Sequence, residues 1–208
     1  MPMIRECIVT TLNAEGRVHI APLGLIAEHL GAERLGAERL GAEGERWIIA
    51  PFRPSATLDN LRASPFAVAN FTDDVLIFAG CLTGKRDWPT EPATAVPGAV
   101  LVGTLAHAEL EVAHIEEDEQ RPRFHCRIVH QASHAPFKGL NRAQGAVIEA
   151  AILASRLHML SRDKIGRELA YLQIAVEKTG GEREHEAWRL LVEKIEDHFK
   201  HAPGSPEC

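Results

Sequence analysis

The sequence predicts an α+β protein in which a small antiparallel β-barrel precedes a C-terminal region of three helices. Three observations support this fold class. Short apolar runs separated by turns fill the first two-thirds of the 208 residues, little of that part reads as helical, and a helical period begins after about Phe137. We expect domains over residues 1–136 and 137–200, and a disordered tail over residues 201–208.

The strand-like runs favour antiparallel pairing, because parallel neighbours need a long crossover after each strand. In chain order they are CIVTTLN, RVHIAPLGLIA, RWIIA, FAVANF, VLIFAG, VLVGTLAHAELEVA and FHCRIVH. Residues 57–63 are the one segment among them that we expect to be helical. Ser64 should end that helix, because the residue before a proline disfavours the helical conformation.

The last third of the chain predicts three helices, in AQGAVIEAAILASRLHML, SRDKIGRELAYLQIAVEKTGG and EREHEAWRLLVEKIEDHF. Ser161 is a candidate N-cap and Gly180 a candidate stop signal. Two apolar stripes at helical spacing are expected to pack on each other and on the barrel: Ile165, Leu169, Leu172 and Val176, and Trp188, Leu191, Ile195 and Phe199. The helices are thus expected to form a cover or a dimerisation element.

A five-residue repeat, LGAERLGAERLGAE, occupies residues 30–43. Its leucines would fall on different sides of a helix and would alternate between the faces of a strand, so it forms no continuous apolar stripe. We interpret residues 28–45 as an insertion in a surface connection, which costs little free energy. A partner-binding role is the alternative.

Composition excludes some classes of partner. The net charge is −6 and the isoelectric point is near 6.0, whereas general nucleic-acid and anionic-membrane binders carry a dominant basic surface. No run approaches the roughly 18 apolar residues of a spanning helix, and the start of the chain lacks a signal-peptide pattern. We therefore expect a cytoplasmic protein. Cys7 and Cys126 are expected to be reduced core residues.

Residues 51–74, PFRPSATLDNLRASPFAVANFTDD, combine a cation, two hydroxyls and a helix start next to a buried strand. Arg53 offers a fork of donors for phosphate, Ser55 and Thr57 offer hydroxyls, and the helix start presents free backbone N–H groups. Asn70 ends the apolar face of the following strand. Further basic residues that could contribute are Arg62, Lys85 and Arg86. The alternative interpretation is ordinary helix capping and surface ion pairing.

Histidines give a weaker signal. His125, His130 and His134 form an H-x4-H-x3-H run, but residues 125 and 130 would point to opposite faces of a strand, and only Cys126 stands near as another ligand. No metal site is expected. His107 and His158 are interpreted as core or surface residues, and no Ser-His-Asp arrangement can be inferred from spacing.

The segments VTTLNAEGRVHIAPLGL and RPSATLDNLRASPFAVANFTDD resemble the FMN-binding split-barrel flavoproteins, which include flavin reductases and pyridoxamine-phosphate oxidases. With NRAQGAVIEAAILASRLHML included, the whole chain is similar to the DUF447 family of uncharacterised split-barrel flavoproteins. The resemblance implies an antiparallel split barrel that dimerises, with FMN bound noncovalently at the subunit interface. Carried onto this sequence, the implied cofactor-binding residues are Arg53, Ser55, Thr57, Asn60, Asn70, Thr72, Thr10, Thr11, Ala21, Pro22, Leu23, Lys85 and Arg86.

The resulting hypothesis is an FMN-dependent oxidoreductase that acts on a small redox metabolite, for which a pterin is one candidate. Because a flavin itself performs hydride or electron transfer, no side-chain catalyst is assigned. Three alternatives stay open: a flavin-binding or flavin-sensing dimer without turnover, a split barrel that binds a deazaflavin or haem, and a structural protein without a ligand. Anaerobic bleaching of bound flavin by NADH or NADPH would count against the first, the colour of the purified protein tests the second, and a stoichiometric chromophore that survives gel filtration would exclude the third.

Overall fold

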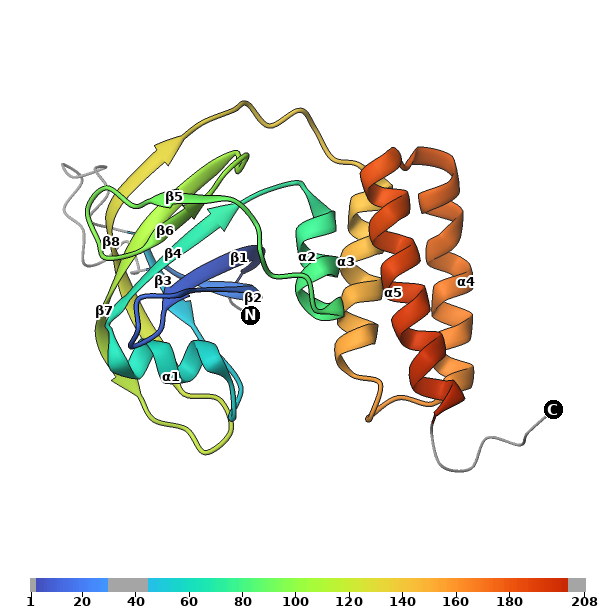
Figure 1. The fold of residues 1–208 in the computed structure, drawn as a ribbon, viewed down its shortest axis with the longest axis horizontal. Helices are drawn as coiled ribbons and strands as arrows, with labels where there is room; N and C mark the ends of the chain where they lie inside the picture. The colour runs from blue at the N-terminus through green and yellow to red at the C-terminus, as the bar shows by residue number, and fades with distance from the viewer. Residues whose placement is uncertain (1–2, 30–44, 202–208) are drawn as a thin grey trace. The chain divides into compact units, whose positions relative to one another are not determined.

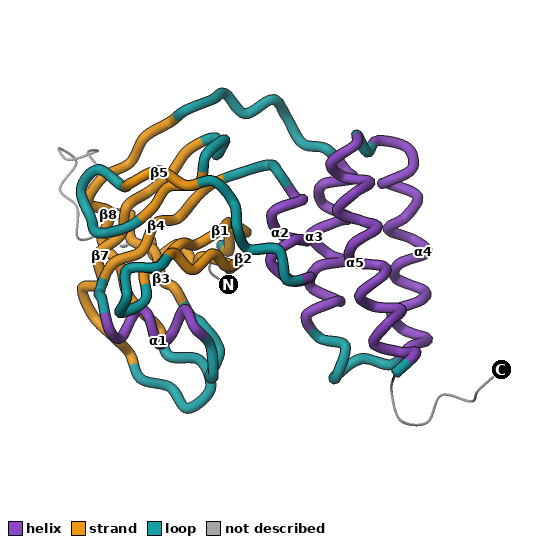
Figure 2. Tube along the Cα trace, in the orientation of Figure 1, coloured by secondary structure: helices purple, strands orange, loops and turns teal. Residues whose placement is uncertain are grey.

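The computed structural model describes residues 3–29 and 45–201. It consists of two compact units, one formed by residues 1–72 and 88–136 and the other by residues 73–87 and 137–208. The first unit contains the β-barrel and the second contains four helices; Figures 1 and 2 show the elements of each. The predicted α+β class, with an antiparallel barrel followed by a three-helix region, is confirmed.

Six antiparallel strands close the barrel in the order β1-β2-β3-β8-β7-β4. Their bounds are β1 Ile4–Leu12, β2 Val18–His29, β3 Glu45–Ile49, β4 Phe66–Phe71, β7 Ala106–Glu116 and β8 Arg123–Ser133. The first hairpin pairs Ile4 with Ile26 and Leu12 with Val18, and Gly16 takes the positive φ that its turn requires. Closure pairs β4 with both β1 and β7, which leaves the barrel without a free edge there.

The barrel interior is filled by alternate residues of every strand, as the two-residue strand period requires. The fully buried set is Cys7, Val9, Leu25, Ala27, Trp47, Ile49, Ala67, Ala69, Ala108, Leu110, Phe124 and Cys126. Cys7 and Cys126 are free thiols, as expected, and burial raises the pKa of both, that of Cys126 to about 12. The two cysteines are therefore inert packing residues.

A short hairpin covers part of the outer face of the barrel. It consists of β5 (Thr90–Pro92) and β6 (Ala99–Leu101), paired antiparallel, and β6 packs against β1 and β4. Beneath it, the side chains of Thr10, Val68 and Asn70 are buried although they point away from the interior. The outer face of these strands is therefore a second buried layer.

The predicted helix near residues 57–63 is α1, Ala56–Ala63. Ser55 caps it by accepting a hydrogen bond from the Leu58 N–H at 3.3 Å, and Ser64 ends it in an extended conformation before Pro65, as expected. Its apolar side chains Leu58 and Leu61 join the barrel core. α1 is thereby fixed against the barrel, with its N-terminus at Ser55.

The helical unit contains α2 (Val75–Thr83), α3 (Arg142–Ser155), α4 (Arg162–Thr179) and α5 (Glu182–Lys200). The prediction that VLIFAG forms a strand is wrong, because this run is the core of α2. A short apolar run is compatible with a strand or with a buried helix. The residues at its two ends favour the helix here, because Asp74 caps the N-terminus and Gly84, at φ 105°, ends the helix. α2 packs on α3 and α5, which explains why it is apolar all round.

The start and stop signals of α4 are confirmed, and the two apolar stripes are buried in part. Ser161 caps α4 by accepting from the Lys164 N–H, and Gly180 ends it. Ile165 and Val176 of the first predicted stripe and Leu191 and Ile195 of the second are buried. Within the described ranges, no helix is both long and apolar enough to cross a bilayer. Of the insertion predicted over residues 28–45, residues 28 and 29 end β2 and residue 45 begins β3, while the rest of it and most of the predicted tail lie outside those ranges.

Candidate functional site

Two guanidinium groups converge on one carboxylate beside α1. Arg53 donates from Nη2 to Oε2 of Glu117 at 2.9 Å, and Arg62 donates to both oxygens of the same carboxylate at 2.7 and 2.9 Å. Arg53 also donates from Nε to the carbonyl oxygen of Asp118 at 3.2 Å. The arginines come from the two ends of α1, and Glu117 follows β7. The arrangement is an exposed pair of cations whose donors meet at one anionic group.

The loop that carries Glu117 contains two carboxylates, Glu117 and Asp118, whose pKa values are both lowered. Hydrogen bonds from Arg62 hold the pKa of Glu117 below its usual range, and the backbone N–H groups of Arg121 and Gln120 do the same for Asp118. Both carboxylates are thus ionised at neutral pH. A surface pocket here is lined by Arg53, Glu117, Asp118 and Glu119. A phosphate would have to share the two arginines with these acidic side chains.

The candidate residues on α1 differ in exposure. Ser55 is half-buried and uses its hydroxyl oxygen as the cap of the helix, whereas Thr57 is buried. The N–H groups of the first turn are those that an α-helix leaves without an intrahelical acceptor. Arg53 therefore lies next to the helix start and Arg62 in the last turn of the helix, with Glu117 between the two guanidinium groups, while Thr57 is buried in the protein.

Asn60 and Thr11, two further candidates, meet inside the barrel unit. The side-chain amide of Asn60 donates to Oγ1 of Thr11 at 2.9 Å, and both side chains are buried. This hydrogen bond joins α1 to β1. In the described structure, the T-x-x-N element therefore supports the position of α1.

Thr10 and Asn70 lie in the buried layer under the β5–β6 hairpin. Asn70 is fully buried, donates from Nδ2 to the carbonyl oxygens of Ile8 and Val68 at 3.1 and 3.2 Å, and accepts from the Leu101 N–H at 2.8 Å. Thr10 donates to the carbonyl oxygen of Ala99 at 2.5 Å. Both side chains link the hairpin to the barrel wall, which corresponds to the structural alternative considered for Asn70.

The remaining candidates of the barrel unit are half-buried. Ala21, Pro22 and Leu23 lie on β2, where they pair with Val9, Ile8 and Cys7 of β1, and Thr72 directly follows β4. Each of these four residues is partly exposed to solvent. They are compatible with a flat ligand lying along the strand, but they share no hydrogen bond with the arginine pair.

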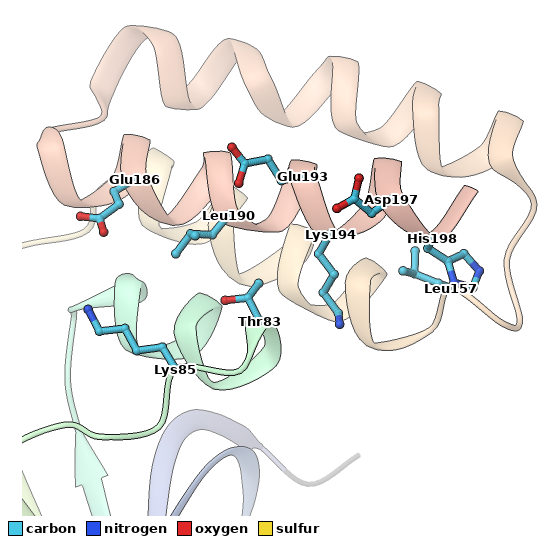
Figure 3. Close-up of a pocket in the computed structure, with 9 residues that line it drawn as sticks. All are labelled: Thr83, Lys85, Leu157, Glu186, Leu190, Glu193, Lys194, Asp197 and His198. Carbon is cyan, nitrogen blue, oxygen red and sulfur yellow. The ribbon is translucent and has the colours of Figure 1, made fainter. Parts of the chain in front are cut away.

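Lys85 and Arg86 belong to the helical unit, just beyond the end of α2. Lys85 lines a pocket of about 630 Å³ together with Thr83, Leu157 and six residues of α5. Figure 3 shows Leu190 and Lys194 extending from α5 toward Thr83, while Glu193 points away. The pocket mixes two lysines with Glu186, Glu193 and Asp197, so it has no dominant sign of charge.

A histidine cluster that sequence reasoning missed lies on the outer face of β7 and β8. His107 Nδ1 is 2.8 Å from His134 Nε2, with the rings stacked, and His107 Nε2 is 3.4 Å from Glu109 Oε1. His130 lies directly opposite Glu109 in the β7–β8 ladder. The available signal was the H-x-E spacing of residues 107 and 109, which places both side chains on one face of a strand.

His125, the third histidine of the run considered from the sequence, lies apart from this cluster. It pairs with His114 and with Glu116, whose Oε2 is 3.4 Å from its Nε2. The expectation that residues 125 and 130 point to opposite faces is wrong, because a register shift between Glu109 and Leu110 turns His130 to the outer face, which His125 shares. The relevant partners of His130 and His134 instead come from β7.

Comparison with solved structures finds a match over nearly the full length. An FMN-bound protein from Methanosarcina mazei, assigned to DUF447, matches with a TM-score of 0.74 and 19% identity, covering 93% of this chain and 96% of that one. A 2-nitrobenzoate 2-nitroreductase from Pseudomonas fluorescens matches with a TM-score of 0.50 and 19% identity, covering 64% and 66%. The flavin reductase HpaC matches with a TM-score of 0.50 and 15% identity, covering 64% of this chain and 81% of that one. At these identities the matches show a shared fold.

Sequence comparison then assigns the family. No curated protein matches this chain. The N-terminal domain of the proteins of unknown function DUF447 matches residues 5–135, and the C-terminal part of the same family matches residues 141–193. The first match ends just before the last residues of the barrel unit, and the second covers most of α3 to α5. The chain therefore belongs to the DUF447 family.

Proposed function

We propose that this protein binds FMN noncovalently on its barrel unit and uses it as an oxidoreductase. The observation that carries the proposal is the match, over 93% of this chain, to an FMN-bound protein of the same family. The chain length, the barrel and the helical region are all included in that match. A shared cofactor is the simplest reason for a family to retain this whole arrangement.

The FMN phosphate is placed beside α1, between Arg53, which precedes the helix, and Arg62, in its last turn. Two guanidinium groups that already converge on the Glu117 carboxylate supply donors for a doubly charged phosphate, and the first turn of α1 adds backbone N–H groups and the positive end of a helix. The chain as a whole is acidic, so this local pair supplies the attraction. Thr57 and Asn60 act by holding the helix in place.

The isoalloxazine ring is placed along β2, against the backbone of Ala21, Pro22 and Leu23, with Thr72 nearby. When bound, FMN supplies hydride or electron transfer. The protein's part is to bind and orient the ring, and backbone N–H donors at its edge favour the reduced anion. The substrate class is a small redox metabolite, and a pterin is the first compound to test.

We further propose a cytoplasmic homodimer with the flavin at the subunit interface. Large apolar side chains on the barrel unit are exposed, among them Ile4 at 54% and Phe52 at 60%, and a partner would cover such surface. Phe52 neighbours Arg53, so an interface there would border the phosphate position. Light scattering coupled to gel filtration, with and without FMN, measures the mass; a monomer in both states would remove the dimer from the proposal.

The first test is an absorption spectrum of the freshly purified protein, followed by mass analysis of what acid releases. Flavin bands and released FMN are expected. A haem or deazaflavin spectrum would replace the cofactor and keep the fold. A colourless protein that takes up no added FMN would overturn the proposal.

The second test removes the arginine pair. Arg53→Ala and Arg62→Ala together should raise the FMN dissociation constant by about tenfold or more, because charge-assisted phosphate contacts are lost. Arg17→Ala is the matched control, since Arg17 is an exposed arginine of the same unit that pairs with Glu15. Equal FMN affinity in the double variant and the control would remove the phosphate assignment.

The third test separates turnover from binding. Under anaerobic conditions, NADH or NADPH should bleach the bound flavin within the time of a catalytic cycle, and an added acceptor should restore the colour. Persistent colour with both nicotinamides, and with a reduced pterin, would favour a flavin-binding protein without turnover.

A further inference from the structure

The histidine cluster on β7 and β8 has the donor atoms and geometry of a metal site. One ligand atom each from His107, Glu109 and His130 lies within 4.8 Å of the other two. Two imidazoles and one carboxylate form a donor set that proteins use for zinc and for other divalent first-row metals. The three side chains project from neighbouring strands of a closed barrel, so the backbone fixes their spacing.

Glu109 is held in one orientation by the loop above it. Its Oε2 accepts the N–H groups of Ala95 and Val96 at 2.6 and 2.9 Å, and its Oε1 accepts the N–H of Thr94 at 2.7 Å. A carboxylate has about four lone-pair sites, and three N–H donors occupy three of them. The remaining lone pair is on Oε1, the oxygen that faces His107. Glu109 can therefore offer one oxygen to a metal without losing its loop contacts.

The separation between His107 and Glu109 fits a shared metal better than a direct hydrogen bond. Nε2 and Oε1 are 3.4 Å apart, longer than the usual 2.9–3.0 Å of an N–H···O bond. Two ligands at about 2.0–2.1 Å from a tetrahedral zinc ion stand roughly 3.3–3.4 Å apart. The observed separation thus equals one edge of such a tetrahedron.

His107 also has the outer contact that metal-bound histidines make. Its Nδ1 is 2.8 Å from His134 Nε2, so a proton on Nδ1 can be donated to His134 while Nε2 keeps its lone pair for a metal. Burial, above all, lowers the pKa of His107, which keeps the ring neutral, as a metal ligand must be. In this tautomer, the lone pairs of Nε2 and Oε1 face each other and need a cation between them.

We propose that this protein binds one divalent transition-metal ion, with zinc the first candidate, through His107 Nε2, Glu109 Oε1 and a ring nitrogen of His130. His134 positions His107 through its ring nitrogen and does not bind the metal. Three protein ligands leave a fourth position for water or a small ligand, as in zinc sites with an open position. Because the ligands and the loop of residues 94–96 are joined by Glu109, metal binding also fixes the β5–β6 hairpin on the barrel.

The test is a calorimetric titration of the untagged, full-length protein with zinc chloride after treatment with a chelator. One zinc per chain is expected, together with a rise in the melting temperature that depends on zinc concentration. Neither zinc uptake nor the melting temperature depends on flavin. The metal proposal can therefore be wrong while the flavin proposal holds, and the flavin proposal can be wrong while the metal proposal holds. No zinc uptake, or uptake without a change in melting temperature, would overturn the proposal.

Three variants locate the ion. His130 is the ligand best suited to replacement because it is only partly buried, and His130→Ala should weaken zinc binding at least 100-fold. His134→Ala should weaken it about 10–100-fold, the usual effect of losing an outer hydrogen-bond partner. His114→Ala, which replaces an exposed histidine of β7, should leave the affinity unchanged. Equal zinc affinity in His130→Ala and wild type would place the ion elsewhere in the protein and overturn the proposal.

Discussion

The side-chain amide of Asn60 donates to the Thr11 hydroxyl across 2.9 Å, and this buried hydrogen bond ties α1 to the first strand of the barrel. Thr11→Val keeps the shape of the side chain but leaves the Asn60 amide without this acceptor. We expect a loss of about 1–3 kcal/mol in the free energy of unfolding, measured by urea denaturation of the flavin-free protein. Adding Asn60→Leu to the Thr11→Val variant should cause little further loss in the free energy of unfolding. Additive losses in this double-mutant cycle would contradict the coupling.

Asn70 is expected to be a larger contributor to stability, because its amide joins β1, β4 and β6. Asn70→Ala deprives the Leu101 N–H of its acceptor beneath the hairpin and opens a cavity. We predict a loss of about 2–4 kcal/mol. Asn13→Ala, which removes a half-buried asparagine of a hairpin turn that accepts from the Glu15 and Arg17 N–H groups, should cost much less. An Asn70 variant of normal stability that no longer binds FMN would instead assign this residue to the flavin.

These two asparagines show what the sequence could and could not predict. Alternation along FAVANF correctly placed Asn70 at the end of a buried face, and Ser64-Pro65 correctly ended α1. The hydrogen-bond partners come from residues 31 and 49 positions away, which local patterns do not reveal. The same limit hid the convergence of Arg53 and Arg62 on Glu117. It also hid the histidine cluster, which depends on the register between β7 and β8.

Local signals failed at α2 for a different reason. VLIFAG is apolar on every side because α3 and α5 cover the helix, so it shows no helical period. The stop signal was present in Gly84, whose positive φ ends the helix. A short run of branched apolar residues favours a strand by propensity, and tertiary packing overrode that preference.

Acidification is expected to destabilise the barrel unit through His107 and Glu109. Burial, as the largest effect, lowers the pKa of His107 below its ordinary 6.5, so the unfolded chain binds the proton more readily and stability falls as the pH drops below that value. Burial raises the pKa of Glu109, but its backbone hydrogen bonds outweigh this and lower it below 4.5. The contribution of Glu109 to the free energy of unfolding is present above pH 4.5 and is lost as the pH falls through the pKa of Glu109 in the folded state.

The measurement is the free energy of unfolding between pH 4 and 8, with a chelator present so that metal release does not contribute. His107→Gln should flatten the pH dependence of the free energy of unfolding just below pH 6.5. It should retain the fall in stability below pH 4.5, which comes from Glu109. His114→Gln, at an exposed position of the same strand, should leave the curve unchanged. A His107 variant with the wild-type curve would show that another group controls this pH range.

Glu117 is predicted to weaken FMN binding, because its carboxylate competes with the phosphate for Arg53 and Arg62. Glu117→Gln removes the like charge and should tighten FMN binding roughly two- to fivefold, a size appropriate to exposed charges. The effect should shrink at high salt. Fluorescence titration with FMN measures it, and Glu15→Gln, which removes the exposed partner of Arg17, is the control. Weaker binding in Glu117→Gln would mean that Glu117 orients the arginines and does not compete.

Asp74 is expected to stabilise α2 in two separable ways. Its Oδ1 accepts the Leu76 N–H at 3.2 Å as the N-cap, and both carboxylate oxygens accept hydrogen bonds from Arg183 at the start of α5. The pair with Asp74 raises the pKa of Arg183, which stays charged at any ordinary pH. Asp74→Asn retains a good cap and loses the ion pair, whereas Asp74→Ala loses both.

Because the Arg183 side chain is half exposed, the ion pair should contribute only about 0.5–1 kcal/mol, and the cap about 1 kcal/mol more. Asp74→Asn should therefore show the smaller loss of stability, and its stability should depend less on salt than that of wild type. Amide hydrogen exchange at residues 76–80 should accelerate most in Asp74→Ala, since the first turn of α2 then loses its acceptor. Equal exchange rates in the two variants would mean that the ion pair, and not the cap, holds α2 in place.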